Sequence, residues 1–506
     1  MARWQALLAT VAAAFALFAS PAAAHEEPAT AAPVLSAFAR TLVGFQPSAA
    51  PAGRNVEVVG HANPREDSNG NIWVHRGYAY MASYGNAGSA CESGVRVFHL
   101  RDPRRPRRVA AFGRADSDPA LAGTYPDQVR LQRVRAPAFR GDLAAVGLQR
   151  CRPPFDGSGG TRGFALYDVT VPARPRLLSI VNTLPVNGSH ELWLQAVGSR
   201  AYVYTAIPRA ELRGSPDGVT PGNPDFRIYD VSDPRAPRQV GQWGIWANLG
   251  IKPSMNEFVH SVITNPGATR AYLSYWEFGT VILDISDPTR PVYVSRARDP
   301  GQHEPPHSHS AALLAGGRVL VETQEFGRFF RFTGTGYPRF FDLTDERNPR
   351  LLSRFVPPGT ESSTVHDPRV AGNRLYLSWY DEGVWVLDVS RPLAPRELGH
   401  LVPSQGQNSG NPFCPSCTFV WGIYPFGDLF VASDMNTGLW VFKLRCTVPD
   451  VRGMTLARAR AALMQANCRS GGVRRAAGAR SGRVVGQSPR PGAHPRFPAA
   501  VRLTVR

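Results

Sequence analysis

The chain has 506 residues, which is enough for a large buried core and more than one domain. Hydrophobic residues make up 43% of it, and 48 glycines with 45 prolines fit a globular chain rich in turns, which excludes a disordered or collagen-like protein. The formal net charge of +18 is unevenly spread, because residues 446–506 contain 12 arginines and one acidic residue, Asp450.

The first 24 residues have the pattern of a secretory signal peptide. Arg3 supplies the positive start, residues 7–18 the apolar core, and residues 22–24 a small-residue cleavage site. Residues 25–53, rich in alanine and proline, are expected to form a flexible leader. No later apolar run reaches the ~20 residues that a membrane-spanning helix needs. We therefore expect an exported protein with no transmembrane segment and no nucleic-acid partner.

One sequence motif recurs through residues 54–445, and it is clearest at residues 226–237, 280–291 and 384–395. In each copy a β-branched and aromatic run is followed by Asp-x-Ser and then a proline. The Asp and Ser side chains bond the local backbone, and the proline ends the strand. Two apolar runs precede the motif and a short strand follows it, so each repeat predicts the four strands of one propeller blade. The residue that ends the run recurs at seven positions: His99, Asp168, Asp230, Asp284, Asp342, Asp388 and Lys443.

The repeat resembles the LVIVD-repeat family, through runs such as Ile282-Leu-Asp-Ile and Val386-Leu-Asp-Val. The resemblance covers about residues 54–445 and implies a propeller in an extracellular protein, without implying a chemistry. We predict an all-β fold with a seven-bladed β-propeller, and six blades are the alternative because the first two copies are the most degenerate. The seventh repeat lacks its outer strand, and residues 54–61 have the pattern of that strand, so we expect them to close the ring.

Six cysteines in an exported protein are expected to form disulfides. Cys446 and Cys468 both lie in the C-terminal region and are expected to pair with each other. Cys91 and Cys151 precede the first two anchor positions and would join two loops. Cys414 and Cys417 form a Cys-x-x-Cys motif without the βαβ context of a redox site, so a local structural disulfide is favoured.

Four successive repeats have a histidine where the innermost strand begins: His190, His260, His309 and His366. Equivalent positions in a propeller converge on its axis, so a ring of imidazoles that binds zinc, copper or iron is one hypothesis. The alternatives are structural histidines that seal the channel, or a polar ligand site without metal. The remaining repeats have Trp421, Asp127 and Trp73 near this position. Without histidines there, one side of the ring would be open. Further residues are candidate ligands or partners of the ligands: Glu304, His307, Glu191, Glu257 and Asp367. We interpret Glu277, Glu325 and Asp381, which recur just before the anchor strands, as turn residues.

The C-terminal region, residues 446–506, has a different pattern. A Val-Pro-x-Val-x-Gly opening at Val448 precedes a helix over residues 457–466 that Thr455 is placed to cap, and a Gln-Ser-Pro-x-Pro-Gly turn precedes a final strand at residues 500–505. In this order the motifs resemble a PASTA domain, which implies a small α+β fold and, in some members, binding of peptidoglycan fragments. The positive charge favours an anionic cell-wall polymer. A spacer that binds no ligand is the alternative.

Two functions follow from these patterns. The first is a secreted, cell-wall-associated binding or scaffold protein, whose PASTA domain contacts peptidoglycan while the propeller presents a surface to a ligand or a protein partner. The second is a metal-dependent enzyme with the histidine ring as its site.

Overall fold

The computed structural model describes residues 52–506 apart from twelve short gaps. The gaps are residues 65–67, 85–93, 151–160, 184–187, 300–305, 315, 326–335, 358–362, 409–410, 412, 477–481 and 497–498. Cys91, Cys151 and Glu304, like the predicted signal peptide and most of the predicted leader, lie outside the described residues.

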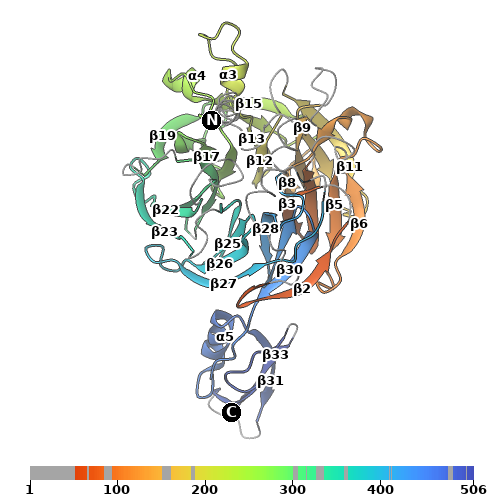
Figure 1. Ribbon diagram of the computed structural model, residues 1–506, viewed down its shortest axis with the longest axis vertical. Helices are drawn as coiled ribbons and strands as arrows, with labels where there is room; N and C mark the ends of the chain where they lie inside the picture. The colour runs from red at the N-terminus through yellow and green to blue at the C-terminus, as the bar shows by residue number, and fades with distance from the viewer. Residues whose placement is uncertain are drawn as a thin grey trace, which may run out of the picture.

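Seven antiparallel sheets of four or five strands contain most of the described chain (Figure 1). The first has β3 (Ser68–His75), β4 (Tyr78–Tyr84), β5 (Val95–His99) and β6 (Arg107–Phe112). The second has β7 (Thr124–Tyr125), β8 (Val129–Arg135), β9 (Arg140–Arg150), β10 (Gly163–Asp168) and β11 (Arg176–Asn182). The third has β12 (Glu191–Val197), β13 (Arg200–Ala206), β14 (Phe226–Asp230) and β15 (Arg238–Trp243). The fourth has β16 (Ser261–Thr264), β17 (Arg270–Tyr275), β18 (Gly279–Asp284) and β19 (Val292–Ala297).

The other three sheets follow in chain order, and two of them include an N-terminal strand. The fifth has β20 (Ser308–Leu313), β21 (Val319–Gln324), β22 (Pro338–Asp342) and β23 (Arg350–Arg354). The sixth has β24 (Pro368–Ala371), β25 (Arg374–Trp379), β26 (Gly383–Asp388), β27 (Arg396–Val402) and β1 (Ala52–Arg54). The seventh has β28 (Val420–Phe426), β29 (Leu429–Asp434), β30 (Gly438–Leu444) and β2 (Val56–Ala62). The short helices are η1 (Pro119–Leu121), α3 (Ala210–Arg213) and α4 (Ile245–Leu249).

The repeated aspartate ends the third strand of its sheet by closing a local turn. Asp284 Oδ1 accepts a hydrogen bond from the backbone N–H of Ser286 at 2.9 Å, and Asp342 Oδ1 accepts one from Thr344 at 2.8 Å. The same contact occurs at Asp168, Asp230 and Asp388. This is the local bonding expected of aspartate in a turn, and the predicted four-stranded repeat is confirmed.

Each turn also packs on the outer strand of the preceding sheet. Ser179 of β11 donates to the carbonyl of Pro234, and Ser353 of β23 donates to that of Pro392. At the equivalent place in β15 there is no hydroxyl, and the backbone of Gly241 lies directly against the carbonyl of Pro288. The apolar core lies between neighbouring sheets, as in the cluster that joins β13 and β14 to β17 and β18.

The innermost strands lie side by side in a closed cycle. Each contacts the next in the order β3, β8, β12, β16, β20, β24 and β28, and β28 contacts β3 again. β2 pairs antiparallel with β30, where the repeat pattern predicted a missing outer strand. On its other side Gly60 of β2 lies against the carbonyl of Pro103, in the turn of the first sheet.

A small α+β unit follows the ring at one end of the molecule in Figure 1, and Arg374 of β25 donates a hydrogen bond to Asn467 Oδ1 of this unit at 2.5 Å. Helix α5 (Leu456–Gln465) begins after Thr455, whose hydroxyl accepts a hydrogen bond from the backbone N–H of Arg458, so the predicted cap is confirmed. A sheet accompanies the helix, with β33 (Ala500–Val505) between β31 (Arg469–Arg475) and β32 (Val484–Ser488). No helix in the described part of the chain is long and apolar enough to cross a membrane.

The structure places two pairs of cysteine sulfurs at bonding distance. Cys446 joins Cys468 in the C-terminal unit. Cys414 joins Cys417 in a loop before β28.

Candidate metal centre

The innermost strands begin close to the ring axis, and irregular pairing there turns one side chain inward. The strand register skips His309 in β20 and Trp421 in β28. His260 and His366 precede β16 and β24, and their backbone N–H groups donate to the neighbouring strand before regular pairing starts. Bulges of this kind re-aim side chains and are frequent beside functional sites.

Four imidazoles follow one another around the axis in sequence order. The ring centroids of His190 and His260 are 4.4 Å apart, those of His260 and His309 4.1 Å, and those of His309 and His366 4.5 Å. Trp421 continues the series at 4.2 Å from His366. All four histidines are buried, and His190, the most exposed, retains 5% of its surface. The structure therefore brings together the histidines that the repeat position had indicated.

Hydrogen bonds at Nδ1 determine which nitrogen of each ring carries the lone pair. His260 Nδ1 lies 3.1 Å from the backbone carbonyl of His309, and His366 Nδ1 contacts the backbone carbonyl of Trp421. A carbonyl can only accept, so both Nδ1 atoms carry a proton and, in a neutral ring, Nε2 is the lone-pair nitrogen. Metal-binding histidines are held in this way, with one nitrogen donating to a carbonyl and the other directed at the ion.

His190 and His260 direct their Nε2 atoms at each other at 2.9 Å. His190 Nδ1 lies 3.2 Å from Gln149 Oε1 and donates to it, so two neutral rings would point lone pairs at each other. Two lone pairs repel at this distance. The contact is favourable when a proton or a metal ion is shared between the rings.

Glu325 adds a carboxylate to the ring. Its Oε2 lies 3.5 Å from His309 Nε2, and the Tyr380 hydroxyl donates a hydrogen bond to its other oxygen. Burial raises the pKa of the Glu325 carboxyl to about 7. The ligand atoms of His260, His309 and Glu325 all lie within 4.8 Å of one another. Two imidazole nitrogens and one carboxylate oxygen form a ligand set found at catalytic zinc and at non-haem iron.

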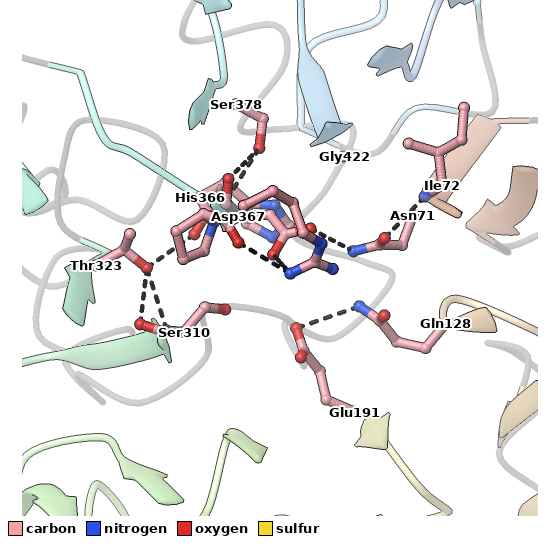
Figure 2. A network of polar contacts seen from close by, with 12 residues as sticks. Asn71, Ile72, Gln128, Glu191, Ser310, Thr323, His366, Asp367, Ser378 and Gly422 are labelled. Carbon is pink, nitrogen blue, oxygen red and sulfur yellow. Dashed lines mark hydrogen bonds and ion pairs between the residues drawn. The ribbon is translucent and has the colours of Figure 1, made fainter. Parts of the chain in front are cut away.

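A second layer of polar side chains lies beside the ring. Figure 2 shows Asn71, Gln128, Glu191 and Asp367 extending from four sheets toward the axis. Asn71 Nδ2 donates to Asp367 Oδ2 at 3.2 Å, and Gln128 Nε2 donates to Glu191 Oε1 at 3.2 Å. Burial raises the pKa of both the Glu191 and Asp127 carboxyls to about 8.

Two of the three other residues predicted near the ring lie there. The Trp421 ring lies against that of His366 at an angle of 42°, and its indole N–H donates to Asp127 Oδ1 at 3.1 Å. The prediction for Trp73 is wrong, because the register of β3 shifts between Asn69 and Ile72 and places Trp73 farther along the axis, beside Trp193.

The open side of the ring, where the repeats have no histidine, stays a prediction. The Tyr84 ring packs 5.1 Å from that of Trp421 and 5.6 Å from that of Phe413. An aromatic cluster therefore surrounds Trp421 at this part of the ring.

The interpretation of Glu325 as a turn residue is wrong, because its carboxylate lies in the ring. The backbone N–H of Glu325 donates to the carbonyl of His307 at 3.1 Å, so the hairpin of β20 and β21 brings Glu325 level with His309. Ser308 and Gln324 are paired in this hairpin, and no sequence signal indicated this register beforehand. Glu257 accepts a hydrogen bond from the backbone N–H of Ser254 in its own turn.

The comparisons with known proteins concern the repeat and the fold. The LVIVD repeat matches residues 271–299, which span the strands from β17 to β19. Raptor from Chaetomium thermophilum is similar in structure, with a TM-score of 0.50 and 13% sequence identity over 76% of this chain and 29% of that chain. This chain thus spans less than a third of the length of Raptor. No curated protein matches the sequence.

The chain is a β-propeller protein. The beta-propeller domain of Myceliophteria thermophila Cps50 (Swd1) is a further match, with a TM-score of 0.46 and 11% identity over 76% of this chain and 99% of that domain. At these identities the similarity concerns the propeller fold alone, and neither match indicates a ligand.

Proposed function

We propose that this propeller binds one transition-metal ion in its histidine ring. The observation that supports the proposal is the cluster of His260, His309 and Glu325, whose ligand atoms lie within 4.8 Å of one another in a fully buried setting. His190 and His366 flank this set, and the Nδ1 bonds of His260 and His366 hold their Nε2 atoms as lone-pair donors. Three imidazoles or more with one carboxylate suit zinc, copper or iron.

Such an ion would supply Lewis-acid or redox chemistry when bound. The chain itself positions the ligands, because backbone hydrogen bonds to the neighbouring strand place His260 and His366 and the Tyr380 hydroxyl holds Glu325. It also excludes bulk water, since these side chains are buried. A metal-dependent enzyme is therefore the function that this geometry supports best, ahead of a scaffold whose propeller only presents a surface.

Elemental analysis of residues 25–506, purified without chelator or affinity tag, tests the proposal. We expect near-stoichiometric zinc, copper or iron in the native protein. A His260→Ala variant and a Glu325→Gln variant should each lose most of it, because each removes one ligand atom from the cluster.

The matched control is His494→Ala, which removes an exposed histidine of the C-terminal unit and should leave the metal content unchanged. Circular dichroism would establish that each variant folds. A native protein that takes up none of zinc, copper, iron or manganese would overturn the proposal, as would folded ring variants with full metal content.

We also propose that the seven sheets form the blades of one ring closed by β2. The support is the closed cycle of contacts between innermost strands, and the contact of β2 with both β30 and the turn at Pro103. We infer that the protein is exported, because residues 1–24 have the pattern of a signal peptide and paired cysteines are stable in an oxidising compartment.

A second proposed function belongs to the C-terminal unit, for which we propose PASTA-type attachment to peptidoglycan or another anionic wall polymer. The helix and three-stranded sheet support this assignment, as does the charge, with 12 arginines against Asp450 in residues 446–506. Arg458 and Arg460 are exposed on α5 and would attract an anionic polymer through salt-sensitive, long-range attraction.

Co-sedimentation of the mature protein with purified cell-wall sacculi tests the attachment. An Arg458→Glu, Arg460→Glu variant should bind several-fold more weakly than the native protein at low salt. The control, Arg235→Glu with Arg290→Glu, reverses two exposed charges on propeller turns and should bind normally. Equal loss in both variants would show that only the net charge matters, which contradicts a site on this unit.

A further inference from the structure

Two buried arginines lie along the propeller axis beyond the histidine ring. Arg130 on β8 and Arg369 on β24 retain 2% and 9% of their surface. Their guanidinium carbons lie 5.2 and 5.5 Å from the centroid of the same indole ring, that of Trp73 on β3. In sequence, Arg130 comes three residues after Asp127, and Arg369 three residues after His366. Three residues of a strand span about 10 Å, so the two arginines lie about that far from the level of the histidine ring.

The two guanidinium groups are only partly satisfied by the protein. Arg130 Nη1 donates to Asn71 Oδ1 at 3.3 Å and to the carbonyl of Val129 at 3.2 Å, and a Glu191 oxygen lies 3.8 Å from Nη2. Arg369 Nη1 contacts Asp367 Oδ1 at 2.8 Å and the carbonyl of Pro368 at 2.9 Å. Within the described part of the chain, no acceptor lies in hydrogen-bond reach of Arg130 Nε or of Arg369 Nε and Nη2.

Buried N–H groups without an acceptor are costly, and on a charged group the cost is larger. The nearby carboxylates do not remove this cost, because each also accepts a hydrogen bond from an amide. Gln128 donates to Glu191, and Asn71 donates to Asp367 (Figure 2). Guanidinium N–H groups are arranged as a planar fork that matches a carboxylate with two parallel hydrogen bonds. An anionic ligand of that shape would satisfy groups that the protein leaves without an acceptor.

The walls beside the arginines are aromatic. The Trp73 ring lies 4.7 Å from that of Tyr424 and 5.7 Å from that of Trp193. Trp193 and Tyr424 are only partly buried, so this end of the axis is closer to solvent than the histidine ring is. An apolar or aromatic body could pack against these rings while its charged end faces the arginines.

We propose that Arg130 and Arg369 form a binding site for a small aromatic carboxylate, with Trp73, Trp193 and Tyr424 as its walls. The carboxylate accepts hydrogen bonds from the two guanidinium groups, and the ring of the ligand lies against the three aromatic side chains. The site is built from its own residues and does not require a metal ion.

Calorimetric titration of the chelator-treated mature protein with benzoate tests this site, with benzamide as the uncharged analogue and sulfate as the non-planar anion. We expect saturable benzoate binding and at least tenfold weaker binding of benzamide and of sulfate. Arg130→Gln and Arg369→Gln should each weaken benzoate binding at least tenfold. Arg135→Gln, on the same strand as Arg130 but exposed, should bind as the native protein does.

Two further variants keep the test decisive if a glutamine variant fails to fold. Arg130→Lys and Arg369→Lys retain the charge but lose the planar fork, and each should still weaken benzoate binding. The proposal is overturned if the metal-free native protein shows no saturable benzoate binding, if sulfate binds as tightly as benzoate, or if the folded lysine variants bind benzoate normally. Chelator treatment separates this result from the metal proposal, because a benzoate bound only to the ion would be lost with it.

Discussion

At the scale of single residues, a buried carboxylate connects two neighbouring sheets. Glu322 of β21 and Arg339 of β22 form an ion pair with both side chains fully buried. Glu322 Oε2 also accepts hydrogen bonds from the hydroxyl of Ser308 at 2.6 Å and from that of Thr280, in the preceding sheet, at 2.5 Å. The buried Glu322 carboxylate thus depends on Arg339 and the two hydroxyl groups together.

Breaking this pair should be far more costly than breaking an exposed one. Glu322→Gln leaves the Arg339 charge buried without its carboxylate, so we expect a loss of about 3–5 kcal/mol in unfolding free energy. Arg396→Gln removes a pair with Asp388 in which the arginine side chain is 74% exposed, and we expect a change below about 1 kcal/mol. Urea unfolding measures both, and equal losses would contradict the role of burial.

At the scale of elements, the repeated aspartate turn is sensitive to acid. Hydrogen bonds from the backbone and side chain of Ser286 hold the pKa of Asp284 below its ordinary value, and those from the side chain and backbone of Thr344 do the same for Asp342. A lowered folded pKa means that the ionised turn stabilises the protein above the unfolded pKa of about 4. That stability is lost as the pH falls through the folded pKa.

The unfolding temperature should therefore be nearly constant between about pH 7 and pH 5 with respect to these groups, and should fall below about pH 4. Asparagine keeps the acceptor oxygen but does not titrate. An Asp284→Asn, Asp342→Asn variant should show a shallower fall in acid, measured by circular dichroism across the pH range. A slope identical to that of the native protein would mean that other carboxyls cause the acid response.

Contacts between sheets depend on the absence of a side chain at Gly241. A Cβ there would collide with the carbonyl of Pro288 in the next sheet, so we expect Gly241→Ala to destabilise the fold by about 1–3 kcal/mol. Gly267→Ala is the matched control, because a Cβ there meets nothing within 4 Å. Chemical denaturation compares them, and a neutral Gly241→Ala would show that the turn can move away without cost.

At the scale of the whole molecule, the N-terminal strand connects the last sheet to the first. β2 pairs with β30 through the register from Val56 with Leu444 to Ala62 with Leu439, and its Gly60 contacts the turn at Pro103. Without β2, the edge of β30 would expose unpaired backbone groups of the kind that promote aggregation.

A protein that starts at residue 64 should therefore unfold at a lower temperature than one that starts at residue 52, and should aggregate more readily. The physical cause is the loss of the six β2 residues that pair with β30 and of the contact with the first sheet. Thermal unfolding and light scattering measure the difference. Equal behaviour of the two proteins would show that the ring does not depend on this closure.

The sequence alone determined the repeat, its four strands and the turn after each third strand, because strand periodicity and Asp-x-Ser-x-Pro chemistry act within a few residues. It also indicated the four histidines, since equivalent positions of a repeat occupy equivalent places around one axis. Only the tertiary structure determined where Glu325 and Trp73 lie relative to the axis, and that Arg130 and Arg369 lie close together. A bulge of one residue changes which side chains face the axis, and partners from different sheets, separated by 239 positions in the case of Arg130 and Arg369, meet only when the ring closes.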